Sequence, residues 1–151
     1  MRALAEGRPI GIRNPRSTRP WQHVLDPLCG YLLLAERLWE APESFGEAWT
    51  FGPPDDDIRP VSWIADGIVE RWGGGSRWQS ASGDARHEAT LLKVDAAKAR
   101  ARLGWEQRLP LAVGLDWTIE WYRAYFAGRP AREMTESQIS RFDLLPEPAG
   151  E

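Results

Sequence analysis

Three arginines fall within seven positions of this chain, at Arg13, Arg16 and Arg19. Prolines and small polar residues separate them, which keeps the backbone extended and leaves the guanidinium groups free for bidentate contacts with phosphate or carboxylate. A ligand that carries a pyrophosphate suits such a loop. The alternative is a solvated basic loop, because runs of charge commonly do no more than face water. The spacing of the arginines alone does not decide between the two.

Two other polar features carry weaker signals. His23 follows the arginine loop, where its ring could either hydrogen-bond to the backbone and fix the turn or contact a ligand, and we expect the structural role. Asp55 to Asp57 resemble a metal site only superficially, because consecutive carboxylates in a proline-bounded loop cannot all reach one ion without further ligands. We expect a solvated acidic turn there.

The glycine cluster at residues 73 to 75 does not have the context of a dinucleotide-binding loop. Such a loop leaves a strand and opens a helix, so that the pyrophosphate meets helical N–H groups. Here the glycines follow a run with helical periodicity, Val61 to Trp72, and lead into a polar stretch. We therefore interpret Gly73 as the stop of that helix.

The elements that must position these residues are short strands and amphipathic helices. A strand is expected over Pro9 to Arg13, ended by Asn14-Pro15, because a residue before proline is pushed toward extended geometry. Asp26 and Pro27 mark the N-cap and first turn of the next helix. Its apolar residues recur at helical spacing and are expected to form a buried face: Leu28, Tyr31, Leu32, Ala35, Leu38 and Trp39.

Similar signals predict the remaining elements. A second short strand is expected at 48–51 and a strand-like segment at 91–94. Asp95 should cap a short helix that ends at Gly104, and Pro110 should precede a helix that ends near Gly128. Thr135 and Gln138 are expected to form a capping box that opens a last turn or two.

Composition is compatible with one compact unit. The chain has 151 residues, 42% of them hydrophobic, and we expect an ordered portion over 1–145 and a disordered tail over 146–151. The formal net charge of -3 argues against nucleic acid as a partner. One cysteine, Cys29, excludes an internal disulfide framework, and the longest apolar run is far below the ~20 residues of a membrane span. Without a recognisable signal peptide, a soluble cytoplasmic protein with no membrane partner is expected.

Nine tryptophans could suggest carbohydrate stacking or an interaction surface. Six of them stand in or next to predicted helices: Trp39, Trp63, Trp72, Trp105, Trp117 and Trp121. We expect most of these to be core residues, because tryptophan buries a large area. Any that remain exposed together would form an apolar patch that marks a lost or separate partner.

Four segments, in this order, resemble the CDP-glucose 4,6-dehydratases of the extended short-chain dehydrogenase/reductase superfamily. They are RNPRSTRPWQHVLDPLCGYLLLAERL at 13–38, EAWTFGP at 47–53, HEATLLKVDAAKARARLGW at 87–105 and TIEWYRAY at 118–125. RPWQHVL and HEA before the leucine-lysine-aspartate block are fairly specific to that family. LGW and EWY are shared more widely among nucleotide-sugar epimerases and dehydratases.

The resemblance implies a fold and an activity. The fold would be a mainly helical α+β piece with a few short strands, the substrate-binding C-terminal part of an α/β enzyme whose N-terminal Rossmann half is absent. The complete enzyme would use tightly held NAD to convert CDP-glucose into CDP-4-keto-6-deoxyglucose and water. NAD is not expected to bind this chain alone, and no catalytic residue is expected, because no tyrosine is followed four positions later by lysine.

The resemblance also implies binding residues. Arg19 would lie at the diphosphate, and Arg13 and Asn14 would frame the substrate loop. His87 and Glu88 would close on the nucleotide, where an imidazole can donate to phosphate or ribose and a carboxylate can accept from ribose hydroxyls or the cytosine amino group. For His87 and Glu88 a solvated loop remains the alternative.

Three hypotheses follow. The chain could be a fragment of a CDP-glucose 4,6-dehydratase that is inactive alone. It could instead be half of a split enzyme, in which a separate N-terminal half docks on an exposed apolar face and restores activity. A non-catalytic nucleotide-sugar-binding module is the third, and it would need a self-contained core without a large apolar patch.

Overall fold

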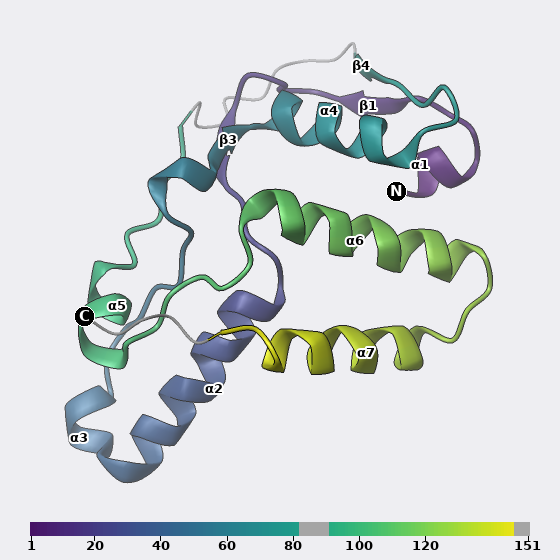
Figure 1. The fold of residues 1–151 in the computed structure, drawn as a ribbon. Helices are drawn as coiled ribbons and strands as arrows, with labels where there is room; N and C mark the ends of the chain where they lie inside the picture. Colours follow the sequence, from purple (N-terminus) through teal and green to yellow (C-terminus); the bar gives the residue numbers. More distant parts are fainter. Residues whose placement is uncertain (82–90, 147–151) are drawn as a thin grey trace.

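The computed structural model describes residues 1–81 and 91–146. Helices dominate these residues (Figure 1). They are α1 (Arg2–Ala5), α2 (Leu25–Glu40), α3 (Pro42–Phe45), α4 (Val61–Trp72), α5 (Ala97–Leu103), α6 (Leu111–Phe126) and α7 (Ala131–Asp143), with a 3-10 turn, η1, at Asp55–Asp57. The strands are β1 (Ile10–Ile12), β2 (Thr18–Pro20), β3 (Ile58–Pro60) and β4 (Trp78–Ser80). The predicted mainly helical piece with a few short strands is confirmed.

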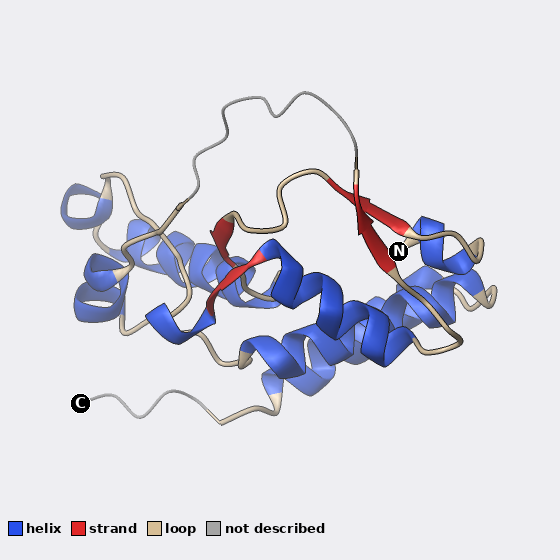
Figure 2. Cartoon of the chain, turned by 90° about the horizontal axis from the view of Figure 1, so that it is seen from above, coloured by secondary structure: helices blue, strands red, loops and turns tan. Residues whose placement is uncertain are grey.

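The strands of the described residues form two separate pairs. β1 pairs with β4 in parallel, with Ile10 opposite Trp78. β2 pairs with β3 in antiparallel register, with Arg19 opposite Arg59. α4 links the two pairs, because it follows β3 directly and leads through the glycine turn into β4 (Figure 2).

α4, α6 and α7 stack in that order on one side of the molecule (Figure 1). The buried side chains between α4 and α6 are Ile64, Leu111, Leu115 and Ile119. Gly67 permits this close approach, since a Cβ atom at this position would lie 2.8 Å from Cδ2 of Leu115. On its other side, α6 places Trp117 against Leu109 and against Phe142 of α7. Both sides of α6 are therefore covered.

A second cluster lies around α5. Its buried members are Phe51, Ala96, Ala99, Leu103 and Trp105. Leu33 and Leu34 of α2 pack against it, and Nε1 of Trp105 donates a hydrogen bond to the carbonyl oxygen of Asp26 at 3.0 Å. These contacts pack one side of α2 against the cluster around α5.

Several predicted boundaries are confirmed. α4 spans 61–72 and stops at Gly73, whose φ of +70° favours glycine. α5 stops at Gly104 with φ +66°, and Oδ1 of Asp95 accepts a hydrogen bond from the first N–H of α5, at Ala97, over 2.8 Å. β1 lies within the predicted first strand.

Other predictions are wrong. Residues 48–51 form no strand but an irregular segment that delivers Phe51 to the α5 cluster. α7 begins at Ala131 rather than at Thr135. Nε2 of Gln138 donates a hydrogen bond to the carbonyl oxygen of Trp117 at 2.8 Å. The pair therefore does not form a capping box. Of the predicted tail, residues 147–151 lie outside the described residues.

The predicted buried face of α2 is also wrong. The side chains expected inside are largely in water: Leu28 is 44% exposed, Tyr31 56%, Leu32 70% and Trp39 90%. The helix packs its opposite side inward instead, because Leu33 and Leu34 contact the cluster around α5 and Cys29 contacts the cluster around Trp117.

Within the described residues, no helix combines the length and apolar character needed to cross a membrane.

Candidate functional site

The arginine loop is held firmly by the start of α4. Its turn closes with a hydrogen bond from the N–H of Ser17 to the carbonyl oxygen of Asn14 at 3.2 Å. The N–H of Val61 donates to the carbonyl oxygen of Ser17 at 2.9 Å, and the N–H of Ser62 to that of Pro15 at 2.8 Å. These N–H groups at a helix start have no partner within the helix, so the loop supplies one. Backbone hydrogen bonds thus fix the conformation of the loop.

The four residues singled out from this part of the sequence differ in burial. Arg13 and Arg16 are exposed, whereas Asn14 and Arg19 are half-buried. Arg19 does not lie in the loop itself but in β2, where its Nη1 donates to the carbonyl oxygen of Thr18 at 2.9 Å. A strand position fixes the backbone of Arg19 more strongly than a loop would, which suits a residue that must meet a ligand.

The other predicted binding residues, His87 and Glu88, lie outside the described residues. The described chain resumes at Leu91, which forms a parallel bridge with Thr18. The N–H of Leu92 donates to the carbonyl oxygen of Thr18 at 3.2 Å. The segment that follows the predicted nucleotide residues is therefore anchored beside Arg19.

Arg59 is a candidate that sequence reasoning missed. It lies directly opposite Arg19 in the β2–β3 pair, so both side chains leave the same face of the sheet. Like charges at such positions repel one another, and an anion bound between them would relieve that repulsion. Arg59 also has its guanidinium group 5.7 Å from the ring centre of Trp63. Only the strand pairing reveals Arg59, because 40 positions separate it from Arg19.

His23 has the structural role expected of it. The residue is buried, and its Nδ1 accepts a hydrogen bond from the N–H of Leu25 at 3.4 Å. Its ring and that of Trp117 are nearly perpendicular, with their centres 5.9 Å apart. Burial lowers the pKa of His23, which favours the neutral ring that can accept at Nδ1. The predicted hydrogen bond that fixes the turn before α2 is confirmed.

Asp26 has a role that the sequence did not indicate. It lies inside α2 rather than capping it, and only 1% of it is exposed. Its Oδ1 accepts hydrogen bonds from the N–H groups of Arg108 at 2.7 Å and Leu109 at 3.4 Å. Burial raises the pKa of Asp26 to about 6, although these backbone hydrogen bonds act in the opposite direction. Asp26 thus ties α2 to the segment that enters α6.

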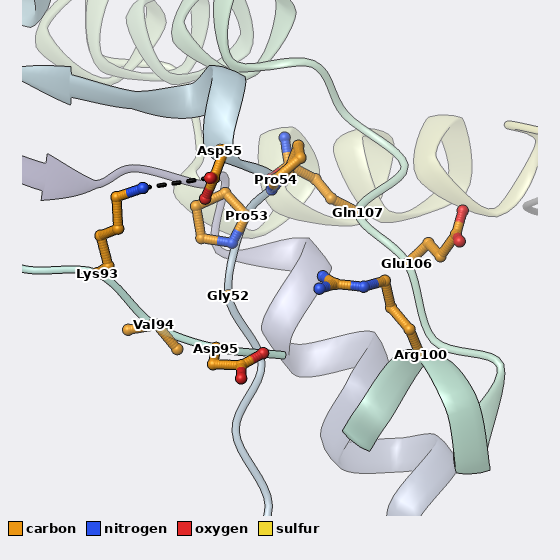
Figure 3. A pocket seen from close by; sticks show the side chains of 10 residues that line it. All are labelled: Gly52, Pro53, Pro54, Asp55, Lys93, Val94, Asp95, Arg100, Glu106 and Gln107. Atoms are coloured by element: carbon orange, nitrogen blue, oxygen red, sulfur yellow. Dashed lines mark hydrogen bonds and ion pairs between the residues drawn. The ribbon is translucent and has the colours of Figure 1, made fainter. Parts of the chain in front are cut away.

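A pocket of about 560 Å³ is lined by none of the residues of the arginine loop. Figure 3 shows Lys93 reaching Asp55 at one end, where Nζ and Oδ2 are 3.2 Å apart, and Arg100 and Glu106 at the other. Its charges are mixed in sign, and Asp55 and Lys93 satisfy one another. This pocket therefore does not correspond to the pyrophosphate-binding site that the sequence predicted.

No group of three potential metal ligands occurs among the described side chains. Asp55 and Asp56 are exposed, as expected of a solvated turn. Asp57 departs from that expectation, because its Oδ2 accepts from Nε2 of Gln107 at 2.6 Å and from the first N–H of α6, at Leu111, over 3.1 Å. Asp57 is a helix cap supplied from a distant part of the chain.

Comparison with known proteins agrees with the predicted resemblance. The chain is 38% identical over 142 residues to CDP-glucose 4,6-dehydratase of Salmonella typhimurium, a match that covers 94% of this chain and 40% of that protein. No protein-family model matches.

Two solved structures share the fold. A UDP-glucuronic acid 4-epimerase mutant from Bacillus cereus, in complex with UDP-4-deoxy-4-fluoro-glucuronic acid and NAD, aligns with a TM-score of 0.66 at 17% identity, covering 82% of this chain and 38% of that one. UDP-glucose 4-epimerase from Stenotrophomonas maltophila, with bound NAD and formylated UDP-arabinopyranose, aligns with a TM-score of 0.61 at 18% identity, covering 84% and 39%. The resemblance is confirmed, and the chain spans about 40% of the length of the proteins that it matches.

Proposed function

We propose that this chain, similar to CDP-glucose 4,6-dehydratase over almost its whole length, is the nucleotide-sugar-binding part of such an enzyme and is inactive alone. The observation that carries the proposal is the arginine loop. The loop lies within the matched region, and hydrogen bonds from α4 hold its backbone. Arg19, half-buried in β2 directly after the loop, lies opposite a second arginine in the β2–β3 pair. Such a pair of guanidinium groups suits a diphosphate, whose two charged groups can each take a bidentate contact.

Arg19 and Arg59 bind the diphosphate of CDP-glucose in this proposal, and Arg13 and Asn14 frame the sugar. His87 and Glu88 close on the ribose and cytosine. Leu91 and Leu92 support that placement, because they anchor the segment after these residues beside Thr18, next to Arg19. The role of the chain is to bind and orient the substrate.

The described residues do not fit NAD, the cofactor that the resemblance implies. The glycine turn at 73–75 leaves α4 and enters β4, whereas a pyrophosphate-binding turn leaves a strand and enters a helix. The N–H groups of Val61 and Ser62 at the start of α4 already donate to the arginine loop. NAD therefore needs residues other than those described.

Calorimetric titration of CDP-glucose into the purified chain tests the proposal, with circular dichroism to establish folding. We expect CDP-glucose to bind and NAD not to bind. Arg19→Gln and Arg59→Gln should each weaken binding about tenfold, or about 1.4 kcal/mol, because each removes a charged pair of donors. Arg16→Gln is the matched control, since Arg16 is exposed and has no proposed role. The proposal is contradicted if the folded chain does not bind CDP-glucose, or if all three substitutions weaken its affinity for CDP-glucose equally.

A second candidate is half of a split enzyme that regains lyase activity with a separate subunit. The exposed apolar face of α2 favours it over a self-contained, non-catalytic module, because a self-contained module would not leave such a face in water.

A further inference from the structure

A cavity of about 330 Å³ lies where β1 and β4 begin and where α4 and α6 end. Figure 1 shows the C-terminal ends of α4 and α6 on the same side of the molecule as α1. Arg8, Arg77 and Arg123 line this cavity, and none of the described residues that line it is an aspartate or a glutamate. We call it the arginine pocket. It collects positive charge from three separate segments of a chain whose formal net charge is -3.

Arg77 is the arginine most available to a ligand. The N–H of Ile10 donates to the carbonyl oxygen of Arg77 at 3.0 Å, which fixes the backbone of Arg77 just before β4. Its side chain is exposed, and it forms no ion pair or hydrogen bond with the part of the chain that the structure describes. The five N–H donors of its guanidinium group are therefore open to a ligand.

Arg8 is less available, because its guanidinium group forms an ion pair with Glu6. Both side chains are exposed, and an exposed ion pair contributes little to stability. A phosphate group carries more charge than one carboxylate, so it competes well for the same guanidinium group. Arg8 thus adds its charge to the pocket once a ligand displaces Glu6.

Arg123 is the arginine that the fold positions best. Its Nη1 donates to the carbonyl oxygen of Arg71 at 3.3 Å, and its guanidinium carbon lies 5.9 Å from the ring centre of Trp72. Carbonyl groups at the end of a helix carry partial negative charge, and Arg123 offsets that charge at the end of α4. Because a guanidinium group has five N–H donors, this contact leaves others for a ligand.

The glycine turn between α4 and β4 adds backbone donors to the pocket. Gly73, Gly74 and Gly75 have φ values of +70°, +63° and +71°, and the N–H of Ser76 closes the turn on the carbonyl oxygen of Gly73 at 3.1 Å. Within the described residues, the N–H groups of Gly74 and Gly75 form no backbone hydrogen bond. Turns with such N–H groups bind anions, and glycine lets a ligand approach the backbone closely.

We propose that the arginine pocket binds a small molecule that carries two phosphate groups, with Arg77, Arg123 and the glycine turn as its main contacts. Three guanidinium groups and two backbone N–H groups suit more negative charge than a single phosphate has. Each planar guanidinium group also matches a pair of phosphate oxygens. A volume of about 330 Å³ is at the lower end for small-molecule sites, which favours a compact ligand over a long polyanion.

The arginine pocket and the arginine loop lie at opposite ends of β1. Pro9 lines the pocket just before the strand, and Arg13 follows the strand at its other end. At ~3.3 Å per residue, the strand separates the two by roughly 10 Å. The pocket shares no lining residue with the site proposed for CDP-glucose, so this inference does not rest on the proposed function.

Calorimetric titration of inorganic pyrophosphate into the full chain tests the inference. Because pyrophosphate also suits the pair of Arg19 and Arg59, the titration uses a chain that carries both Arg19→Gln and Arg59→Gln. We expect this chain to bind pyrophosphate. Adding Arg77→Gln or Arg123→Gln should weaken that binding about tenfold, because each removes a charge from the pocket. Arg132→Gln is the matched control, since Arg132 is exposed on α7 and lies outside the pocket.

Two further measurements locate the bound pyrophosphate. Glu6→Gln should tighten binding roughly threefold, because it releases Arg8 from an exposed ion pair. In amide NMR spectra, pyrophosphate should shift the N–H signals of Gly74 and Gly75. Circular dichroism of every variant excludes misfolding as the cause of a loss.

Three results overturn the inference: no pyrophosphate binding by the chain with Arg19→Gln and Arg59→Gln, equal weakening by Arg77→Gln and Arg132→Gln, or unchanged signals of the glycine turn. Vesicles of phosphatidylcholine and phosphatidylserine that bind the chain when free pyrophosphate does not would also overturn it, and would assign the pocket to lipid headgroups. Failure of the proposed function is distinguishable, because it appears as lost CDP-glucose binding by the unsubstituted chain while pyrophosphate still binds the arginine pocket.

Discussion

α2 and α6 are both 16 residues long and both rich in apolar side chains, yet the fold treats them differently. α6 lies between α4 and α7, and it buries residues on both sides: Leu111, Gly114, Leu115, Trp117 and Ile119. α2 buries only Asp26 and Gly30 fully and leaves Leu32 and Trp39 in water. The difference shows that described residues cover α6 on both sides, whereas α2 has the composition of a buried helix but is covered on one side only.

The largest expected effect is at the centre of the completed region. Trp117→Ala should lower the free energy of unfolding by about 3 to 5 kcal/mol, because Trp117 is 7% exposed and its removal leaves a cavity between α6 and α7. Leu32→Ala on α2 should change it by less than about 0.5 kcal/mol. Urea denaturation followed by circular dichroism compares the two. A comparable loss in both variants would show that the exposed side of α2 is covered in solution, and the contrast between the helices would fail.

Asp26 lies where α2 meets the segment before α6, and we expect it to make the stability of the fold depend on pH. Burial raises its folded-state pKa from 3.8 to about 6, so the folded state binds the proton more tightly than the unfolded state. Its contribution to stability is therefore fully present below pH ~4 and is lost as the pH rises to about 6, with a total of about 3 kcal/mol.

Asp26→Asn should remove this part of the pH dependence and make the chain more stable at pH 7. The amide oxygen can still accept from the N–H groups of Arg108 and Leu109, and no charge is buried. Urea denaturation of both proteins at pH 4, 5, 6 and 7 measures the effect. Parallel profiles for the two proteins would mean that Asp26 keeps an ordinary pKa.

The smallest of these effects probes the inner side of α2. A Cβ atom at Gly30 would clash with the Phe51 ring and would lie 2.9 Å from Nε1 of Trp105. Gly30→Ala should therefore lower the free energy of unfolding by about 1 to 3 kcal/mol, although alanine favours helices more than glycine does. Ala35→Gly, at an exposed position of α2, is the matched control, and it should lose only the difference in helix propensity, about 1 kcal/mol. Equal or inverted effects would indicate that the inner side of α2 is loosely packed.

Local signals predicted much of the fold. The bounds of α4, the glycine stops at 73 and 104 and the contact from Asp95 to α5 all depend on residues within a few positions of one another. The turn fixed by His23 is of the same kind. The predictions that are wrong involve residues whose partners lie far along the chain. Asp26 meets Arg108 and Gln138 reaches Trp117, so neither serves the helix end that its type suggested. Asp57, expected in a solvated turn, caps α6 instead.

The candidate site divides in the same way. Arg13, Asn14 and Arg19 were found from residue type, spacing and resemblance, and the comparison with the Salmonella enzyme supports the resemblance. Arg59 required the pairing of β2 with β3. His87 and Glu88 remain predictions, because they lie outside the described residues.

The sequence by itself determined most of the longer helices, the glycine stops that end two of them and the family that the chain resembles, because hydrophobic period, capping residues and glycine stops act locally. Only the tertiary structure decided which side of α2 faces inward and which arginine stands opposite Arg19. Hydrophobic periodicity states that a side chain favours burial, but burial itself depends on what is present to cover it. For α2, the described part of the chain covers one side and leaves the side chains of the other exposed.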